Sequence, residues 1–143
     1  MKTLLSLAIA IMAFAAVTVT TQAQSSQPVR AQIPFAFHVS NTELAAGEYS
    51  VTVLNRNSDQ SVLQIKSLDG RTSAIIHARG TTEHAADKSI LVFHQYGESY
   101  FFAQLQIAGE SALTTARSKA ERIEAKAAPR LASKPVVAIV NTY

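Results

Sequence analysis

Apolar and polar residues alternate with a period of two in several parts of this chain, and this alternation restricts its possible folds more than any other feature. Successive side chains of a β-strand point to opposite faces, so the alternation is typical of strands with one buried face. The first such segment covers residues 29–39, and a second begins at Tyr49 after a turn near Gly47. Pro34 cannot donate a ladder hydrogen bond, so we predict that the first strand lies at a sheet edge or carries a bulge there.

The next part of the chain is predicted to form a hairpin. A third strand covers residues 61–68 and a fourth returns through residues 74–78. Asp69-Gly70 between them is typical of a two-residue type I′ turn, because Asp and Gly tolerate the positive φ angles that this turn requires. The polar segment 55–60 before the hairpin is predicted to be a loop.

A second hairpin is predicted around Gly97-Glu98, with strands at residues 90–93 and 100–102. Both faces of this pair are apolar in either register. We therefore expect it to lie centrally in the sheet and to be covered on both sides. The polar segment 80–88 before it is predicted to be a loop.

One helix is predicted near the carboxyl end. Ser118 and Glu121 match a capping box, in which the Ser oxygen accepts from the Glu121 amide and the Glu carboxylate reaches back to the Ser118 amide. The helix should extend to about Ala128, because Pro129 stops it. A narrow apolar stripe is expected to dock this helix on the sheet. Its members are Ala116, Ala120, Ile123 and Ala127.

The pattern as a whole predicts a mostly β fold, either an antiparallel β-sandwich or a partly open barrel, with one C-terminal helix. We assign this domain to residues 24–128. Such a length suffices for one hydrophobic core, and because the chain has no cysteine, the core must stabilise the fold without disulfides. Residues 129–143 form a tail, in which 135–140 resemble one more strand. Whether that strand joins the sheet stays open.

The first 23 residues are predicted to be a secretory signal peptide. Lys2 provides a positive start, residues 4–17 form an uncharged apolar run too short to span a bilayer, and Thr21-Gln22-Ala23 offers a small-x-small cleavage site. The mature protein is therefore expected in the periplasm or the medium, without stable membrane insertion. The absence of cysteine argues against a lipoprotein.

No catalytic, metal or cofactor signature occurs in the sequence, so we predict a non-catalytic protein without a cofactor. The four histidines lack the spacing that places two imidazoles on one metal. They are His38, His77, His84 and His94. No Gly-x-Ser-x-Gly elbow or glycine-rich phosphate loop is found. The alternative is a small hydrolase-like enzyme with a site assembled from loops, of which His84 and His94 are the best candidates.

Aromatic residues concentrate on the second hairpin, and two interpretations of them stay open. They are Phe93, Tyr96, Tyr100, Phe101 and Phe102. One interpretation is that they fill the core and pack under the helix. The other is that residues near the turn bind a ligand, an envelope protein or a glycan. The candidates for ligand binding are Tyr96, Tyr100 and His94, and both tyrosines are expected to be partly exposed.

The net charge of the chain is +3, and six basic residues gather between Arg117 and Lys134. Glu121 and Glu124 lie among them, as on a solvated helix face. The other interpretation is a surface for acidic polymers or anionic lipid. Export argues against nucleic acid as a partner.

Four segments together resemble a family of small exported bacterial β-rich proteins of unknown function. They are IPFAF at 33–37, LAAGEYSV at 44–51, LVFHQYGESYFFAQL at 91–105 and SKAER at 118–122. The family pattern has an IPF-type first strand, an LPAGxY turn, a VFxxYG...YFL hairpin and a Ser-x-x-Glu-Arg helix. This sequence has Ala46 where the turn usually has Pro. The resemblance implies a β-sandwich-like domain and brings no activity or binding residue with it.

Overall fold

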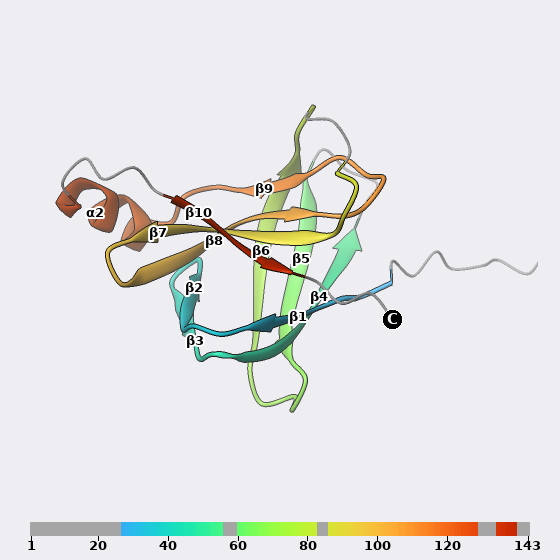
Figure 1. Cartoon of the computed structure of the whole chain (residues 1–143), viewed down its shortest axis with the longest axis horizontal. Coiled ribbons are helices and arrows are strands. Elements are labelled where there is room, and N and C mark those ends of the chain that lie inside the picture. The colour runs from blue at the N-terminus through green and yellow to red at the C-terminus, as the bar shows by residue number, and fades with distance from the viewer. Residues whose placement is uncertain (1–26, 56–59, 83–85, 129–133, 140–143) are drawn as a thin grey trace, which may run out of the picture.

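The computed structural model describes residues 27–55, 60–82, 86–128 and 134–139 (Figure 1). The predicted signal peptide lies outside these residues. The described residues contain no helix long and apolar enough to cross a membrane. They form ten strands and one helix, α2 (Lys119–Ala127). The strands are β1 (Val29–Ile33), β2 (Phe37–Val39), β3 (Thr42–Leu44), β4 (Gly47–Asn55), β5 (Ser61–Ser67), β6 (Ser73–Gly80), β7 (Ile90–Tyr96), β8 (Ser99–Gln106), β9 (Leu113–Thr115) and β10 (Lys134–Ile139).

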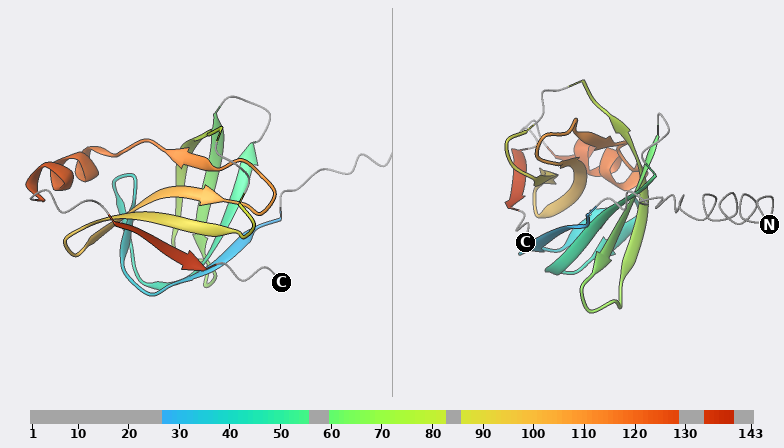
Figure 2. Two further views of the ribbon diagram at one scale, coloured as in Figure 1. Left: turned by 45° about the horizontal axis from the view of Figure 1, so that its top comes forward. Right: turned by 90° about the vertical axis from the view of Figure 1, so that its right-hand side faces the viewer.

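All ten strands belong to one hydrogen-bonded sheet that folds into two layers. The main path is β1–β4–β5–β6–β9–β8–β7–β10, and the β2–β3 hairpin attaches to β8. Figure 2 shows β4–β6 in green as one layer, with β7–β10 in yellow to red as the other. The ends of the path approach each other at β1 and β10, but no ladder joins them within the described residues. The prediction of a mostly β fold with one C-terminal helix is confirmed.

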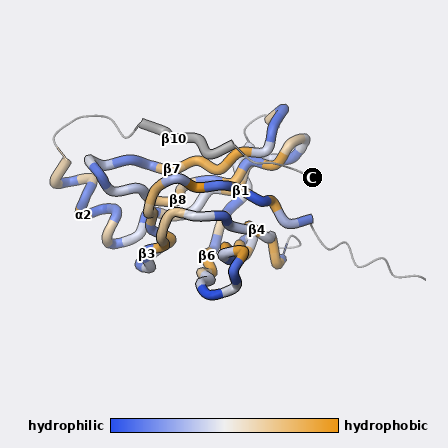
Figure 3. Tube along the Cα trace, turned by 60° about the horizontal axis from the view of Figure 1, so that its bottom comes forward, coloured by the Kyte–Doolittle hydropathy of each residue, from blue (hydrophilic) through white to orange (hydrophobic). Residues whose placement is uncertain are grey.

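The core lies between the two layers and is built by the predicted alternation. Along β1, residues 29, 31 and 33 are buried and the two between them are exposed. Fully buried side chains come from both layers, as burial of apolar surface requires. The largest are Phe37, Phe93, Ile33, Leu44, Leu63, Ile65, Leu91 and Leu105. In Figure 3 the hydrophobic stretches follow the strands, whereas α2 is largely hydrophilic.

The prediction of one continuous strand over residues 29–39 is wrong. The strand breaks after Ile33, so that β1 pairs with β4, while β2 pairs with β3 and, in parallel, with β8. Pro34 lies at the break, where its missing amide proton removes a ladder hydrogen bond. The alternation continues across the break because Phe37 and Val39 also face the core.

The two predicted hairpins both form, but the first has a longer loop than expected. Gly70 has a φ of +73°, as predicted. The loop covers residues 68–72, and the Gly70 amide donates to the Ser67 carbonyl oxygen at 2.9 Å. The proposed two-residue type I′ turn at Asp69-Gly70 is therefore wrong. At the second hairpin, two residues connect β7 to β8, and Gly97 has a φ of +60°.

The second hairpin lies centrally in its layer, as predicted. β7 pairs with β8 along its length and with β10 at its other edge, and β8 also pairs with β9 and β2. The C-terminal strand, whose place the sequence left open, thus joins the sheet antiparallel to β7.

The helix is confirmed, but its predicted apolar docking stripe is wrong. Ser118 caps α2 and accepts a hydrogen bond from the Glu121 amide at 3.1 Å. Ile123, however, is 57% exposed, and Ala116 and Ala127 are exposed as well. The residue that α2 buries is Glu121, 3% exposed. A polar contact, rather than an apolar stripe, fixes the helix on the sheet.

Candidate functional site

The aromatic hairpin divides its side chains between the core and the helix. Phe93 and Phe102 belong to the core, and Tyr100 packs against it, stacked on Phe35 with a centroid distance of 4.1 Å. His94 lies opposite Phe101 in the ladder, and both residues face the other side of the hairpin. On that side, His94 and Tyr96 contact Glu121 of α2. The interpretation that one set fills the core and the other packs under the helix is therefore correct.

The Glu121 carboxylate is the centre of a polar cluster beneath the helix. Its Oε1 lies 2.7 Å from Nδ1 of His94 and accepts a hydrogen bond from the Tyr96 hydroxyl at 3.2 Å. Nε of Arg117 lies 3.7 Å from the same oxygen. A buried carboxylate is costly unless it is paired and hydrogen-bonded, and these three partners supply both. The capping-box glutamate thus uses its carboxylate to attach the helix to β7.

The cluster also changes the acidity of Tyr96. Burial raises the pKa of the Tyr96 hydroxyl, and the negative charge of Glu121 raises it further. Both effects disfavour the phenolate. Tyr96 therefore stays a hydrogen-bond donor at neutral pH, which the geometry of the cluster requires.

The three predicted ligand-binding residues do not form one surface. Tyr96 is 7% exposed, so the expectation that it is partly exposed to solvent is wrong. Helix α2 covers it, and no residue near Tyr96 in the sequence indicates that cover. Tyr100 is partly exposed, as expected, but on the opposite side of the hairpin, where its hydroxyl accepts from the Gln95 side chain. The His94 side chain is 28% exposed. Binding by these three residues stays a prediction.

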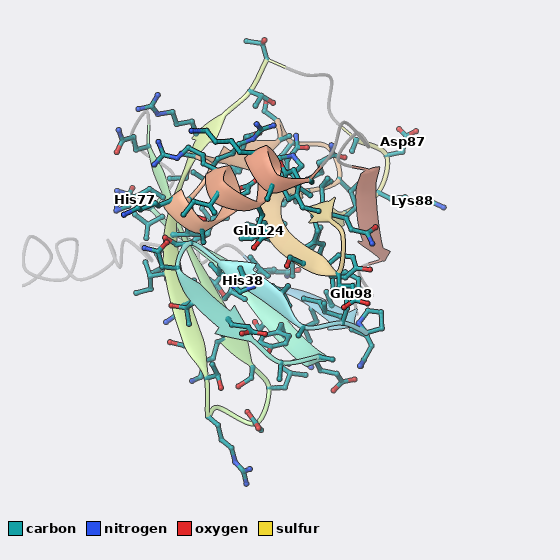
Figure 4. The ribbon with its side chains drawn as sticks, turned by 90° about the vertical axis from the view of Figure 1, so that its left-hand side faces the viewer. His38, His77, Asp87, Lys88, Glu98 and Glu124 are labelled. Carbon is teal, nitrogen blue, oxygen red and sulfur yellow. The ribbon has the colours of Figure 1, made fainter. Side chains whose placement is uncertain are left out.

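Of the described histidines, His38 and His94 both lie opposite Phe101, on two strands that flank β8, whereas His77 lies on β6. His38 stacks on Phe101 with a centroid distance of 4.8 Å, and His77 projects outward from β6, away from His38 (Figure 4). His84 lies outside the described residues. In the part of the chain that the structure describes, no group of three or more histidines and carboxylates could hold a metal ion.

A groove of about 360 Å³ opens between β6 and β9. It is formed where the short strand β9 pairs with the last three residues of β6. Among the described residues, its lining combines hydroxyl, amide and basic side chains with two alanines and has no carboxylate. These residues are Gln60, His77, Ala78, Arg79, Thr81, Thr114, Thr115 and Ala116. Such a volume is within the range of small-ligand sites, roughly 300–1,000 Å³.

The threonines of this groove differ in their hydrogen bonding. The Thr115 hydroxyl donates to the carbonyl oxygens of Phe102 and Ala103, each at 3.1 Å, and so ties β9 to β8. The Thr81 amide donates to the Ala112 carbonyl oxygen at 2.9 Å. Its hydroxyl oxygen, by contrast, is buried without a hydrogen-bond partner among the described residues. Buried polar groups are normally paired, so this hydroxyl is an exception that needs an explanation.

A second hollow, of about 420 Å³, lies beside the β5–β6 turn. Several of its residues form hydrogen bonds within the turn and the neighbouring strand. The Tyr49 hydroxyl donates to the Ala45 carbonyl oxygen at 2.7 Å, and Asp69 accepts from Ser67 and from the Arg71 amide. These hydrogen bonds hold the pKa of the Asp69 carboxyl below its usual value. The hollow is therefore explained by the structure of the turn.

No family model matches the chain, and no curated protein and no solved structure is similar to it. The resemblance to the exported β-rich family stays a prediction.

Sequence reasoning missed the groove entirely. Its lining comes from residues 60, 77–81 and 114–116, which share no motif or local spacing. It also missed that Glu121 is buried. Two of its partners, Arg117 and His94, are present in the sequence but lie apart from each other. These residues do not predict the burial of Glu121 until the position of the helix on the hairpin is known.

Proposed function

We propose that this protein is an exported, non-catalytic β-domain that binds a glycan in the groove between β6 and β9. The observation that carries the proposal is the lining of the groove, in which hydroxyl, amide and basic side chains surround a volume of about 360 Å³. Such groups match the hydroxyl groups of a sugar as donors and acceptors. Binding of a protein strand is the competing outcome.

Two further features support a glycan over an apolar peptide. The described residues of the groove include no large apolar side chain that could form a pocket for a peptide side chain, and the aliphatic members among them are Ala78 and Ala116. The aromatic side chains of the hairpin, which could have formed an apolar strip, are buried or partly buried. The exposed large hydrophobic residues are isolated aliphatic ones. A protein partner would normally bury aromatic anchors, which this surface lacks.

The proposed location rests on the sequence of residues 1–23. A basic start, an uncharged apolar run and a small-x-small site support export. An exported domain without disulfides must rely on its core, and the core described above uses most of the large side chains. We propose the periplasm or the medium as its place of action.

A glycan array probed with the mature chain, starting at Gln24, tests the proposal. We expect binding that Ala116→Trp abolishes, because Ala116 lines the groove and is exposed, so a large ring would fill it. Ala45→Trp is the matched control: Ala45 is also exposed but lines the second hollow. Both variants should melt like the parent. Loss of binding in Ala45→Trp alone, or no bound glycan at all, would reject the groove.

The hydrolase alternative is kept because of one observation, the 2.7 Å contact between Glu121 and His94. A carboxylate at Nδ1 orients an imidazole in many acid–base sites. A panel of chromogenic esters and glycosides tests this alternative. We expect no turnover; turnover that His94→Ala removes, while the fold persists, would replace the binding proposal with an enzymatic one.

A further inference from the structure

We infer that the ligand of the β6–β9 groove carries an anionic group and that Arg79 and His77 bind it. This inference rests on the proposed glycan-binding function and names the class of glycan, an acidic one. It is supported by the charge of the described lining, by the Thr81 hydroxyl without a described partner and by the positions of three described acids.

The described lining of the groove contains two basic side chains and no acidic one. Arg79 and His77 both line it, are exposed, and form no ion pair or hydrogen bond within the described residues. They are two residues apart on β6, so their side chains lie on the same face of the strand. Two cationic or donor groups at a groove whose described lining has no carboxylate favour an anion there.

Three of the described acids are placed away from Arg79 and His77 or are already paired. Asp87 and Glu98 lie on the opposite side of the domain from His77 (Figure 4). Glu121, the acid nearest along the chain to the groove residue Ala116, is buried and already contacts His94, Tyr96 and Arg117. It cannot neutralise Arg79 as well. Lys119, exposed at the start of α2, adds a further positive charge three residues after Ala116.

The Thr81 hydroxyl supplies the second argument. A buried hydroxyl without a partner is unfavourable, yet the residue lines the groove. Rotation about χ1 exchanges the hydroxyl and the methyl group, which would direct the O–H toward a bound oxygen. An anionic oxygen accepts such a hydrogen bond more strongly than a neutral one. The guanidinium of Arg79 would form the complementary pair with the same group, since its fork matches carboxylate, sulfate and phosphate oxygens.

Matched probes test the inference. Tetragalacturonate and its methyl ester differ in their carboxylates, and sulfated and unsulfated isomaltotetraose differ in their sulfates. We expect at least one acidic member to bind about tenfold or more tightly than its neutral partner, with affinity that falls as salt rises. Arg79→Gln should remove most of that difference. Arg30→Gln is the control, because Arg30 is an exposed arginine on β1, which β4 and β5 separate from β6.

Thr81 offers a test in which folding and binding respond differently. Thr81→Val removes the unpaired hydroxyl but keeps the shape, so the melting temperature should stay the same or rise. Affinity for the acidic probe should fall several-fold, and Thr81→Ser should retain it. An unchanged affinity in Thr81→Val would remove this residue from the site.

The outcomes separate the two proposals. If the array finds a glycan that Ala116→Trp releases, but acidic and neutral probes bind alike and Arg79→Gln changes nothing, the inference fails while glycan binding stands. If Arg30→Gln weakens binding as much as Arg79→Gln, the charge effect is general and the assignment to the groove is wrong. If no glycan binds, both proposals are rejected.

Discussion

The two layers of this domain bury their side chains differently. In the layer of β1, β4, β5 and β6, buried and exposed residues alternate, and the outer face is open to solvent. In the β7–β8 hairpin, both faces are covered, one by the core and the other by α2. Alternation of apolar and polar residues therefore indicates a buried face only where the other face of the strand is open to solvent. Once a helix covers the second face, polar residues such as Glu121 can be buried as well.

Removing one large hydrophobic side chain from each layer should produce the largest difference. Phe101→Ala is expected to lower the free energy of unfolding by about 3–5 kcal/mol, because it leaves a cavity beside the rings of His38 and Tyr96. Ile75→Ala, on the open face of β6, should change it by less than about 0.5 kcal/mol, since Ile75 is 59% exposed. Urea unfolding of both variants measures this. Equal effects would mean that the two faces do not differ as described.

The polar attachment of α2 should contribute the next largest effect. Glu121→Ala is expected to cost about 2–3 kcal/mol, because His94 and Tyr96 lose their common partner. Glu124→Ala, on the exposed side of the same helix, is the control and should be nearly neutral. A double-mutant cycle with Tyr96→Phe apportions the effect between the two contacts. A neutral Glu121→Ala would show that apolar contacts alone hold the helix.

A smaller effect is expected at the turn of the open layer. Gly70 has a φ of +73°, and a Cβ there would meet only the end of the Lys66 side chain, at 3.9 Å. Gly70→Val should therefore cost about 1–2 kcal/mol through backbone strain and not through a clash. Thermal melts with Gly80→Val as control, a position without positive φ, check this. A Gly80→Val variant that melts lower than Gly70→Val would contradict it.

The smallest effect should appear only at alkaline pH. The pKa of Tyr96 is raised above 10.0 in the folded state by burial and by Glu121. This tyrosine therefore stabilises the fold fully below pH 10, and the contribution is lost as the pH rises through the folded value. The free energy of unfolding of the parent should fall more steeply between pH 9 and 11 than that of Tyr96→Phe. Parallel curves for the two proteins would contradict the raised pKa.

Much of the local structure could be predicted from the sequence, because each signal depends on neighbouring residues. The strands β4 to β6 follow from alternation and turn signals, and β7 and β8 from the apolar runs on either side of Gly97-Glu98. The positive φ of Gly70 follows from the turn residues, and the start of α2 from the cap at Ser118. The strand β9 could not be predicted, since three residues are too few to show a period. The length of the β5–β6 loop was also missed, because Asp69-Gly70 fits more than one turn type.

Sequence alone determined the class of the fold and the position of the helix. It also predicts export. Tertiary structure decided which strands pair across the break at Pro34 and that Glu121 is buried. It also decided that residue 60, residues 77–79 and 81, and residues 114–116 line one groove. The physical reason is the range of the interactions. Periodicity, caps and turns are set within a few residues, whereas burial of a carboxylate or convergence of a groove depends on contacts between segments far apart in the chain.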